Sequence, residues 1–114
     1  MNNKFWNSLI EMVKSKSITI DRPKNSIHPR YPDYIYPFDY GYFNFTSSSD
    51  GDEIDCWIGS LGKETLSGIV VVLDPIKGDS EIKILLGCTD DDMKSILECH
   101  ERGDMSGILI KKPE

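Results

Sequence analysis

The chain reads Tyr36-Pro37-Phe38-Asp39-Tyr40-Gly41-Tyr42 and, after seven further residues, Asp50-Gly51-Asp52-Glu53-Ile54-Asp55. The second segment places four carboxylates within six residues. At about 5 Å and an effective dielectric near 20, each pair of like charges costs on the order of 3 kcal/mol, so a folded protein solvates, protonates or chelates such a group. Gly51 lets the backbone bend so that Asp50 and Asp52 can both turn inward. We interpret the segment as a candidate cation site; a plain solvated turn is the alternative.

The residues around this segment predict short strands and two helices. Apolar residues at helical spacing predict an opening helix from Phe5 to Val13, and the cap and acidic first turn Thr89-Asp90-Asp91-Asp92 predict a second helix. Segment 22–42 carries four prolines and many aromatic residues and is expected to be an ordered loop with room for one short strand. Strands are expected at 18–21, 54–58, 69–73, 81–86 and 108–110. This order predicts a mainly β fold, a small barrel with accessory helices.

Length and charge limit the possible functions. A chain of 114 residues, 39% apolar and 28% charged, is expected to form one domain over residues 1–114. Its net charge of -6 disfavours nucleic acids and anionic membranes as partners. Without a membrane-length apolar run or a signal-peptide pattern, we expect a cytoplasmic protein.

The carboxylates favour a hard cation. Oxygen ligands at this density suit Mg²⁺, or Mn²⁺, better than Zn²⁺, which prefers nitrogen and sulfur. A calcium loop of the EF-hand type is disfavoured because Gly51 is in the second position rather than the sixth, and Leu61 is in the twelfth.

Basic residues suggest where an anionic ligand would be bound. Arg22, Lys24 and Arg30 form a local positive patch, with a solvated basic loop as the alternative. Lys83 is the stronger candidate, because it lies two residues from Glu81 and therefore on the same face of a strand.

The aromatic residues of this region are expected to be structural. Tyr34, Tyr36 and Tyr42 are interpreted as packing residues with a polar tip, Trp57 as a core residue, and His28 as a residue that orders its loop.

Together, Tyr36-Pro37-x-x-Tyr40-Gly41-Tyr42 and the Asp50-Gly51-Asp52-x-x-Asp55 run resemble the signature region of soluble family I inorganic pyrophosphatases. The resemblance covers roughly 18–87 and is looser after residue 68. It implies a five-stranded barrel of the oligonucleotide-binding type. It also implies Mg²⁺-dependent hydrolysis of pyrophosphate, the small-molecule substrate, to two phosphates.

The resemblance also implies roles for individual residues. Asp50 and Asp55 correspond to metal ligands, Asp52 to the carboxylate that orients or deprotonates the attacking water, and Tyr40 to a tyrosine near the phosphate site.

Further along, Glu81 and Lys83 match an acidic-x-Lys pair in which the family usually has Asp. Asp74 matches the preceding acidic ligand with two extra residues between, and Asp79 is the substitute. Arg30, offset by about two residues, joins Arg22, Lys24 and Lys83 as a substrate-binding candidate.

The chain also departs from the family pattern. Ser17 and Thr19 stand where longer members carry Lys-x-Glu, and only His100 and Arg102 are candidates for a later Tyr-Lys pair. Two functions therefore stay open: a compact metal-dependent pyrophosphatase, and a catalytically weak or inactive barrel that binds a metal or phosphate ligand. A homo-oligomer is compatible with the large aromatic loop, which self-association would cover.

Overall fold

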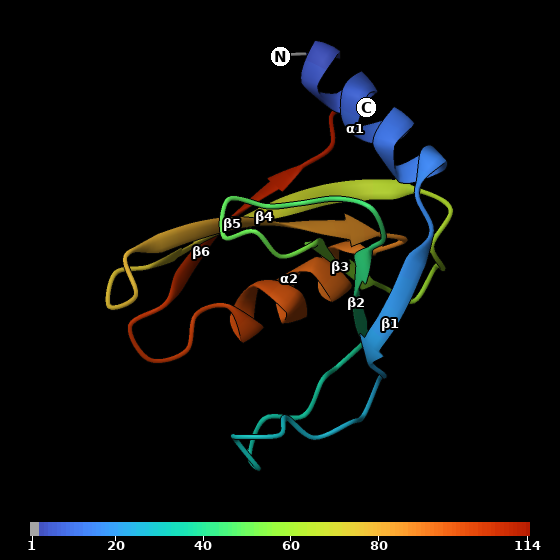
Figure 1. The fold of residues 1–114 in the computed structure, drawn as a ribbon. Coiled ribbons are helices and arrows are strands. Elements are labelled where there is room, and N and C mark those ends of the chain that lie inside the picture. Colours follow the sequence, from blue (N-terminus) through green and yellow to red (C-terminus); the bar gives the residue numbers. More distant parts are fainter. Residues whose placement is uncertain (1–2) are drawn as a thin grey trace.

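The computed structural model describes residues 3–114, which form two helices and six strands. In chain order they are α1 (Asn3–Ser15), β1 (Ile18–Arg22), β2 (Asp39–Phe43), β3 (Ile54–Ile58), β4 (Leu66–Asp74), β5 (Asp79–Leu86), α2 (Asp90–Cys99) and β6 (Ser106–Lys111). The strands form one sheet, and α1 and α2 lie on opposite sides of it (Figure 1). The prediction of a mainly β fold with accessory helices is confirmed.

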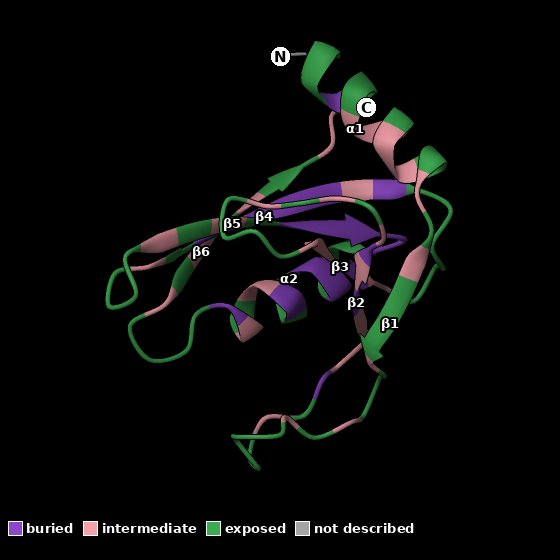
Figure 2. Cartoon of the chain, viewed as in Figure 1, coloured by how far each residue is buried: buried purple, intermediate pink, exposed green. Residues whose placement is uncertain are grey.

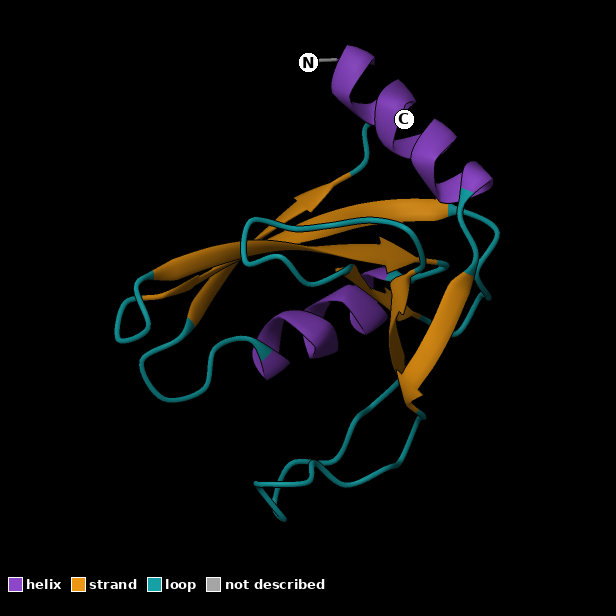
Figure 3. Ribbon diagram, viewed as in Figure 1, coloured by secondary structure: helices purple, strands orange, loops and turns teal. Residues whose placement is uncertain are grey.

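The sheet has the strand order β1-β2-β3-β5-β4-β6. β3 and β5 are parallel, and the other neighbouring pairs are antiparallel. Within residues 3–114, β1 and β6 do not pair with each other, so the sheet coils without closing (Figure 3). The expected five-stranded barrel is therefore corrected to an open sheet of six strands.

β2 accounts for part of this difference, because it forms at the end of a segment expected to be mainly loop. It lies between β1 and β3, and Gly41 pairs with Ile20 on one side and Cys56 on the other. A Cβ atom at Gly41 would lie 2.0 Å from the carbonyl oxygen of Thr19, so the strands approach this closely only with glycine. Backbone pairing with β1 and β3 therefore stabilises β2, although the prolines and aromatic residues before it favour a loop.

Alternate residues of the central strands fill two apolar clusters on the two faces of the sheet. Trp57 and Leu85 belong to the cluster that packs on α2. Cys56 and Ile84, their neighbours in sequence, belong to the cluster that contains Trp6 of α1. Figure 2 shows the buried residues concentrated in β3, β4 and β5 and on the sheet-facing side of α2. The period-two alternation of strands therefore gives the sheet an apolar core on each face.

The N-terminus of α2 is fixed as its sequence predicted. Asp92 donates its backbone N–H to Thr89 Oγ1, and Thr89 donates its backbone N–H to Asp92 Oδ2, each at 3.1 Å. This reciprocal capping box satisfies two helix-end donors. Neither helix in the described part of the chain has the length and apolarity needed to cross a membrane.

The loop between β1 and β2 is ordered by its own backbone. Asn25 donates to the carbonyl of Tyr36 at 2.8 Å, Tyr36 donates to that of Ser26 at 3.0 Å, and Ile27 and Ile35 form an isolated bridge. The loop projects from the sheet (Figure 1) and returns at the start of β2, beside the site described next.

Candidate functional site

Lys83 is the centre of a half-buried polar cluster. Its side chain is only 8% exposed, and its Nζ lies 2.6 Å from Asp55 Oδ2, 3.0 Å from Tyr40 Oη and 3.4 Å from Glu81 Oε2. Tyr40 donates its hydroxyl to the same Asp55 oxygen at 2.8 Å. The structure therefore brings four of the predicted site residues into one hydrogen-bonded group.

The strand register explains why these residues meet. Glu81 and Lys83 are two apart on β5 and share a face of the sheet. The parallel pairing of β3 with β5 sets Cys56 opposite Ile84, which brings the preceding residues of both strands, Asp55 and Lys83, side by side. β2 adds Tyr40 from the other side of β3.

The protonation of this group follows from burial and charge. Burial raises the pKa of Glu81, Lys83 opposes that shift, and the charges of Asp55 and Asp50 add to it. Burial and the Asp55 charge raise the pKa of Tyr40, so its hydroxyl stays a donor. Hydrogen bonds from the Ser48 hydroxyl and the Asp52 backbone lower the pKa of Asp50, and the Glu81 carboxyl also bonds to it. Two carboxyl groups, Asp55 and Glu81, thus share one ammonium, and Asp50 adds a third negative charge nearby, which favours an additional cation.

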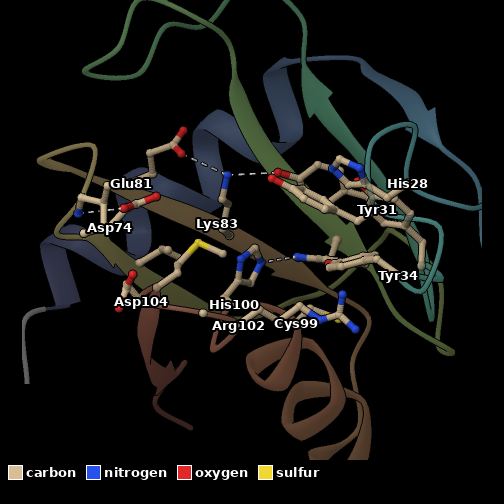
Figure 4. Close-up of a pocket in the computed structure, with 17 residues that line it drawn as sticks. His28, Tyr31, Tyr34, Asp74, Glu81, Lys83, Cys99, His100, Arg102 and Asp104 are labelled. Carbon is tan, nitrogen blue, oxygen red and sulfur yellow. Dashed lines mark hydrogen bonds and ion pairs between the residues drawn. The ribbon is translucent and has the colours of Figure 1, made fainter.

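A cavity of about 530 Å³ opens over this cluster. It has an aromatic side and an acidic side, with Lys83 and His100 between them (Figure 4). We define the aromatic side as His28, Tyr31 and Tyr34, and the acidic side as Asp74, Glu81 and Asp104.

His100, at the end of α2, faces the same cavity. Its Nε2 accepts a hydrogen bond of 3.0 Å from Trp57 Nε1, so Nδ1 carries the proton of the neutral ring. Burial, assisted by the positive charge of Lys83, lowers the pKa of His100 to about 3. His100 is therefore an uncharged polar group near neutral pH. Trp57 is fully buried, as predicted for a core residue.

The other predicted acidic residues are more dispersed. Asp74 lines the cavity and accepts the backbone N–H groups of Ile76 and Lys77, each at 3.1 Å. Asp79 instead lies 3.5 Å from the ammonium of Lys77. Asp52 is exposed; its backbone N–H donates to Asp50 Oδ1 at 2.9 Å, and its backbone carbonyl accepts from the Ser48 hydroxyl at 3.0 Å. Of Asp74 and Asp79, the structure favours Asp74 as a cavity residue.

The predicted basic patch is only partly directed at the cavity. Arg22 lies 3.5 Å from Asp21, and Lys24 lies over the ring of Phe38 at 5.7 Å. Arg30 donates its backbone N–H to His28 Nδ1 at 3.0 Å, which agrees with the expected loop-ordering role of His28. Among the described residues, the cations that line the cavity are Lys83 and Arg102.

The described residues provide only part of a ligand set for the expected Mg²⁺. Within residues 3–114, no three His, Cys, Asp or Glu side chains are arranged to hold a metal ion. Asp55 is already paired with Lys83, whereas Asp50 and Glu81 approach each other with oxygen donors. Mg²⁺ commonly takes one or two carboxylates and completes its shell with water and substrate phosphates. Among residues 3–114 no all-protein cage forms, so a bound Mg²⁺ would need water and substrate oxygens to complete its shell.

The sequence did not indicate that some of these residues line the cavity. Tyr31 and Asp104 had no assigned role, and Tyr34 and Tyr36 were expected only to pack. Tyr36 does pack, with 6% exposure, but it also lines the cavity. The density of tyrosines between 31 and 42 was the signal that could have indicated an aromatic wall.

Fold and site together define a small β-sheet protein with a charged cleft whose buried lysine and rim arginine suit a phosphorylated ligand. The chain is similar to the inorganic pyrophosphatase of Picrophilus torridus, with 33% identity over 72 residues. The matched region is 57% of this chain and 40% of that relative, so the chain spans less than half of the relative's length. No family model and no solved structure matches the chain.

Proposed function

We propose that this protein hydrolyses inorganic pyrophosphate, or a related small phosphoanhydride, to phosphate with the help of Mg²⁺. The observation that supports this most directly is the Lys83 ammonium, held by Asp55, Tyr40 and Glu81 at the base of a cavity. The partial similarity to an inorganic pyrophosphatase points to the same reaction.

The charges make a cation necessary. Pyrophosphate carries about three to four negative charges near neutral pH, and the carboxyl groups around Lys83 would repel it without cations between them. Bound Mg²⁺, or Mn²⁺, would neutralise phosphate oxygens and lower the pKa of a water molecule. In this proposal Asp50 and Glu81 hold the metal ion together with the substrate.

The protein's own groups would bind and orient the substrate. Lys83 presents a point charge to phosphate oxygens, and Arg102 a planar pair of donors at the rim. Tyr40 keeps its proton and holds Asp55 and Lys83 in place. Asp52, in the neighbouring turn, is proposed to accept the proton of the attacking water, a contribution typically worth about 10² to 10⁴ in rate.

The proposal is tested by phosphate release from pyrophosphate with Mg²⁺ present. We expect Asp52→Asn to lower the rate at least about a hundredfold, because the amide cannot accept the proton. Asp91→Asn is the matched control, since Asp91 is an exposed carboxylate of α2 away from the cavity. Its rate should equal that of the wild type.

Unchanged activity in Asp52→Asn would remove Asp52 from the mechanism. A wild-type protein that releases no phosphate from pyrophosphate, nucleoside triphosphates or short polyphosphate, with Mg²⁺ or Mn²⁺, would instead support a binding protein without turnover.

A further inference from the structure

The cavity is larger than its proposed substrate requires. Its volume of about 530 Å³ lies within the range of pockets that enclose drug-sized organic molecules. Pyrophosphate has only two phosphorus atoms and their oxygens, and Lys83, where it would bind, lies between the acidic and aromatic sides of the cavity. The remaining lining therefore needs its own explanation.

On the aromatic side, the lining is a continuous series of rings that leads away from Lys83. The centres of neighbouring rings are 5.7 Å apart for Tyr40 and Tyr36, 4.9 Å for Tyr36 and Tyr34, 5.6 Å for Tyr34 and His28, and 4.8 Å for His28 and Tyr31. The inner rings are packed in the core, whereas Tyr31 is 60% exposed. The outer rings therefore keep surface that a flat ligand can cover.

We infer that the cavity binds a nucleoside di- or triphosphate, with the base against the aromatic side and the terminal phosphates at Lys83. This assignment of a substrate class rests on the proposed phosphoanhydride hydrolysis at the same site. Every nucleobase has a flat π-face that stacks on tyrosine or histidine. The guanidinium of Arg102 lies over the Tyr34 ring, 4.3 Å from its centre, so it covers one face of that ring and adds a flat cation on which a base can itself stack.

The acidic side fits a small nucleotide better than a nucleic-acid strand. Asp74 and Asp104 lie on the far side of Lys83 from the aromatic rings, where they would face the terminal phosphates through the Mg²⁺ that accompanies the nucleotide. A long polyanion would instead need a basic groove, and the chain has a net charge of -6.

The reaction on a nucleoside diphosphate would be hydrolysis of its anhydride. The oxygen of water forms a bond to the terminal phosphorus, and the bond from that phosphorus to the bridging oxygen breaks. The nucleoside monophosphate leaves with the bridging oxygen and its electron pair. One proton of the water stays on the inorganic phosphate near neutral pH, and the other is accepted by Asp52, the proposed base, and released from it to solvent.

Two pairs of variants isolate the contribution of the aromatic side. Tyr31→Leu and Tyr34→Leu remove a ring, and Tyr31→Phe and Tyr34→Phe keep it. Phe45→Leu removes an 89% exposed ring that does not line the cavity and serves as a further control. Circular dichroism checks that each variant is folded. Binding is measured by calorimetry with Mg²⁺, using α,β-methylene-ADP and methylenediphosphonate, and turnover is measured with ADP and pyrophosphate.

We expect the nucleotide analogue to bind at least about tenfold more tightly than the diphosphonate. Each Leu variant should weaken nucleotide binding by on the order of 5- to 100-fold, the range typical of one base stacked on an aromatic ring. Diphosphonate binding should stay within about twofold in all variants, and the Phe variants should behave as the wild type.

The outcomes separate this inference from the proposed function. Turnover of pyrophosphate without ring-dependent binding of the nucleotide analogue would overturn the inference alone. Ring-dependent nucleotide binding without turnover of ADP or pyrophosphate would support the nucleotide site and overturn the hydrolase. Equal weakening of both analogues by the Leu variants would show a general packing role for these tyrosines and overturn the inference.

Discussion

Protonation of His100 is coupled to the stability of the folded protein. The residue is 6% exposed, its Nε2 is taken by the Trp57 indole, and its pKa is lowered from 6.5 to about 3. Protonation would place a second positive charge near Lys83 and break the bond from Trp57. The unfolded chain therefore binds a proton on His100 more readily than the folded chain does.

This difference gives a pH dependence with a defined sign. His100 contributes fully to stability above pH 6.5, and the contribution is lost as the pH falls toward 3, because only the unfolded state is protonated in that interval. Between pH 7 and 4.5 we expect the free energy of unfolding to fall by about 2–3 kcal/mol more in the wild type than in His100→Gln, whose side-chain oxygen still accepts from Trp57. Urea unfolding at both pH values measures it.

The contributions of the other groups with shifted pKa values to this pH dependence cancel in the comparison, because those groups are present in both proteins. The pKa of Asp92 is lowered from 3.8 to about 2, so its effect falls mainly below the tested interval. Equal losses of stability in wild type and His100→Gln would show that His100 is readily protonated in the folded protein.

At the scale of elements, Asp92 joins α2 to the loop after β3. Its Oδ2 accepts the backbone N–H of Ser60 at 2.9 Å, the Ser60 hydroxyl at 2.6 Å and the backbone N–H of Thr89 at 3.1 Å. Burial opposes ionisation of Asp92, but these hydrogen bonds outweigh it and lower the pKa to about 2. One carboxylate thus serves as both a helix cap and a link between two elements.

Removal of this carboxylate should cost more than an ordinary capping residue. We expect Asp92→Ala to lower the free energy of unfolding by about 2–3 kcal/mol, because the cap is lost and the Ser60 donors lose their partner. Asp91→Ala, in the same helical turn but exposed, should change it by only about 0.5 kcal/mol. Urea unfolding at pH 7 compares the two. Losses of equal size would mean that the link to Ser60 does not stabilise the fold.

Elements with their own signals were predictable from sequence. α2 has a complete capping box, and β3 alternates over 54–58, where it was expected. β4, β5 and β6 run beyond the predicted 69–73, 81–86 and 108–110, because backbone pairing continues past the apolar runs, as it does between Leu66 and Leu86 and between Asp74 and Asp79. The sequence allowed one short strand within 22–42 but did not place β2, because the position of this strand depends on partners distant in the sequence.

The same distinction applies to the site. The spacing of Glu81 and Lys83 was enough to place both on one face, and the resemblance added Asp55 and Tyr40. The exposed position of Asp52 and the pairing of Asp79 with Lys77 depend on how two turns fold back, which spacing does not determine. The aromatic side of the cavity could not be predicted, because it depends on the path of the loop between β1 and β2. That path is set by backbone hydrogen bonds such as the one from Asn25 to Tyr36.

At the scale of the whole molecule, the two apolar clusters are joined through shared strands. Cys56 and Trp57 are consecutive in β3 yet belong to different clusters. Ile84 and Leu85 are likewise consecutive in β5 and belong to different clusters. Opening one cluster therefore requires disruption of strands that hold the other. Such sharing favours a single cooperative unfolding transition.

Each cluster contains one tryptophan, so the cooperativity can be tested directly. In Trp57→Phe, the fluorescence of Trp6 reports the α1 side, and in Trp6→Phe that of Trp57 reports the α2 side. Both variants should lose stability, and Trp57→Phe also loses the bond to His100. Within each variant, however, fluorescence and far-ultraviolet circular dichroism should give the same midpoint in urea, because the shared strands leave neither face stable alone. A Trp6 signal that changes at clearly lower urea than the circular dichroism would show that α1 and its cluster detach separately, and the sheet would then not couple its two faces.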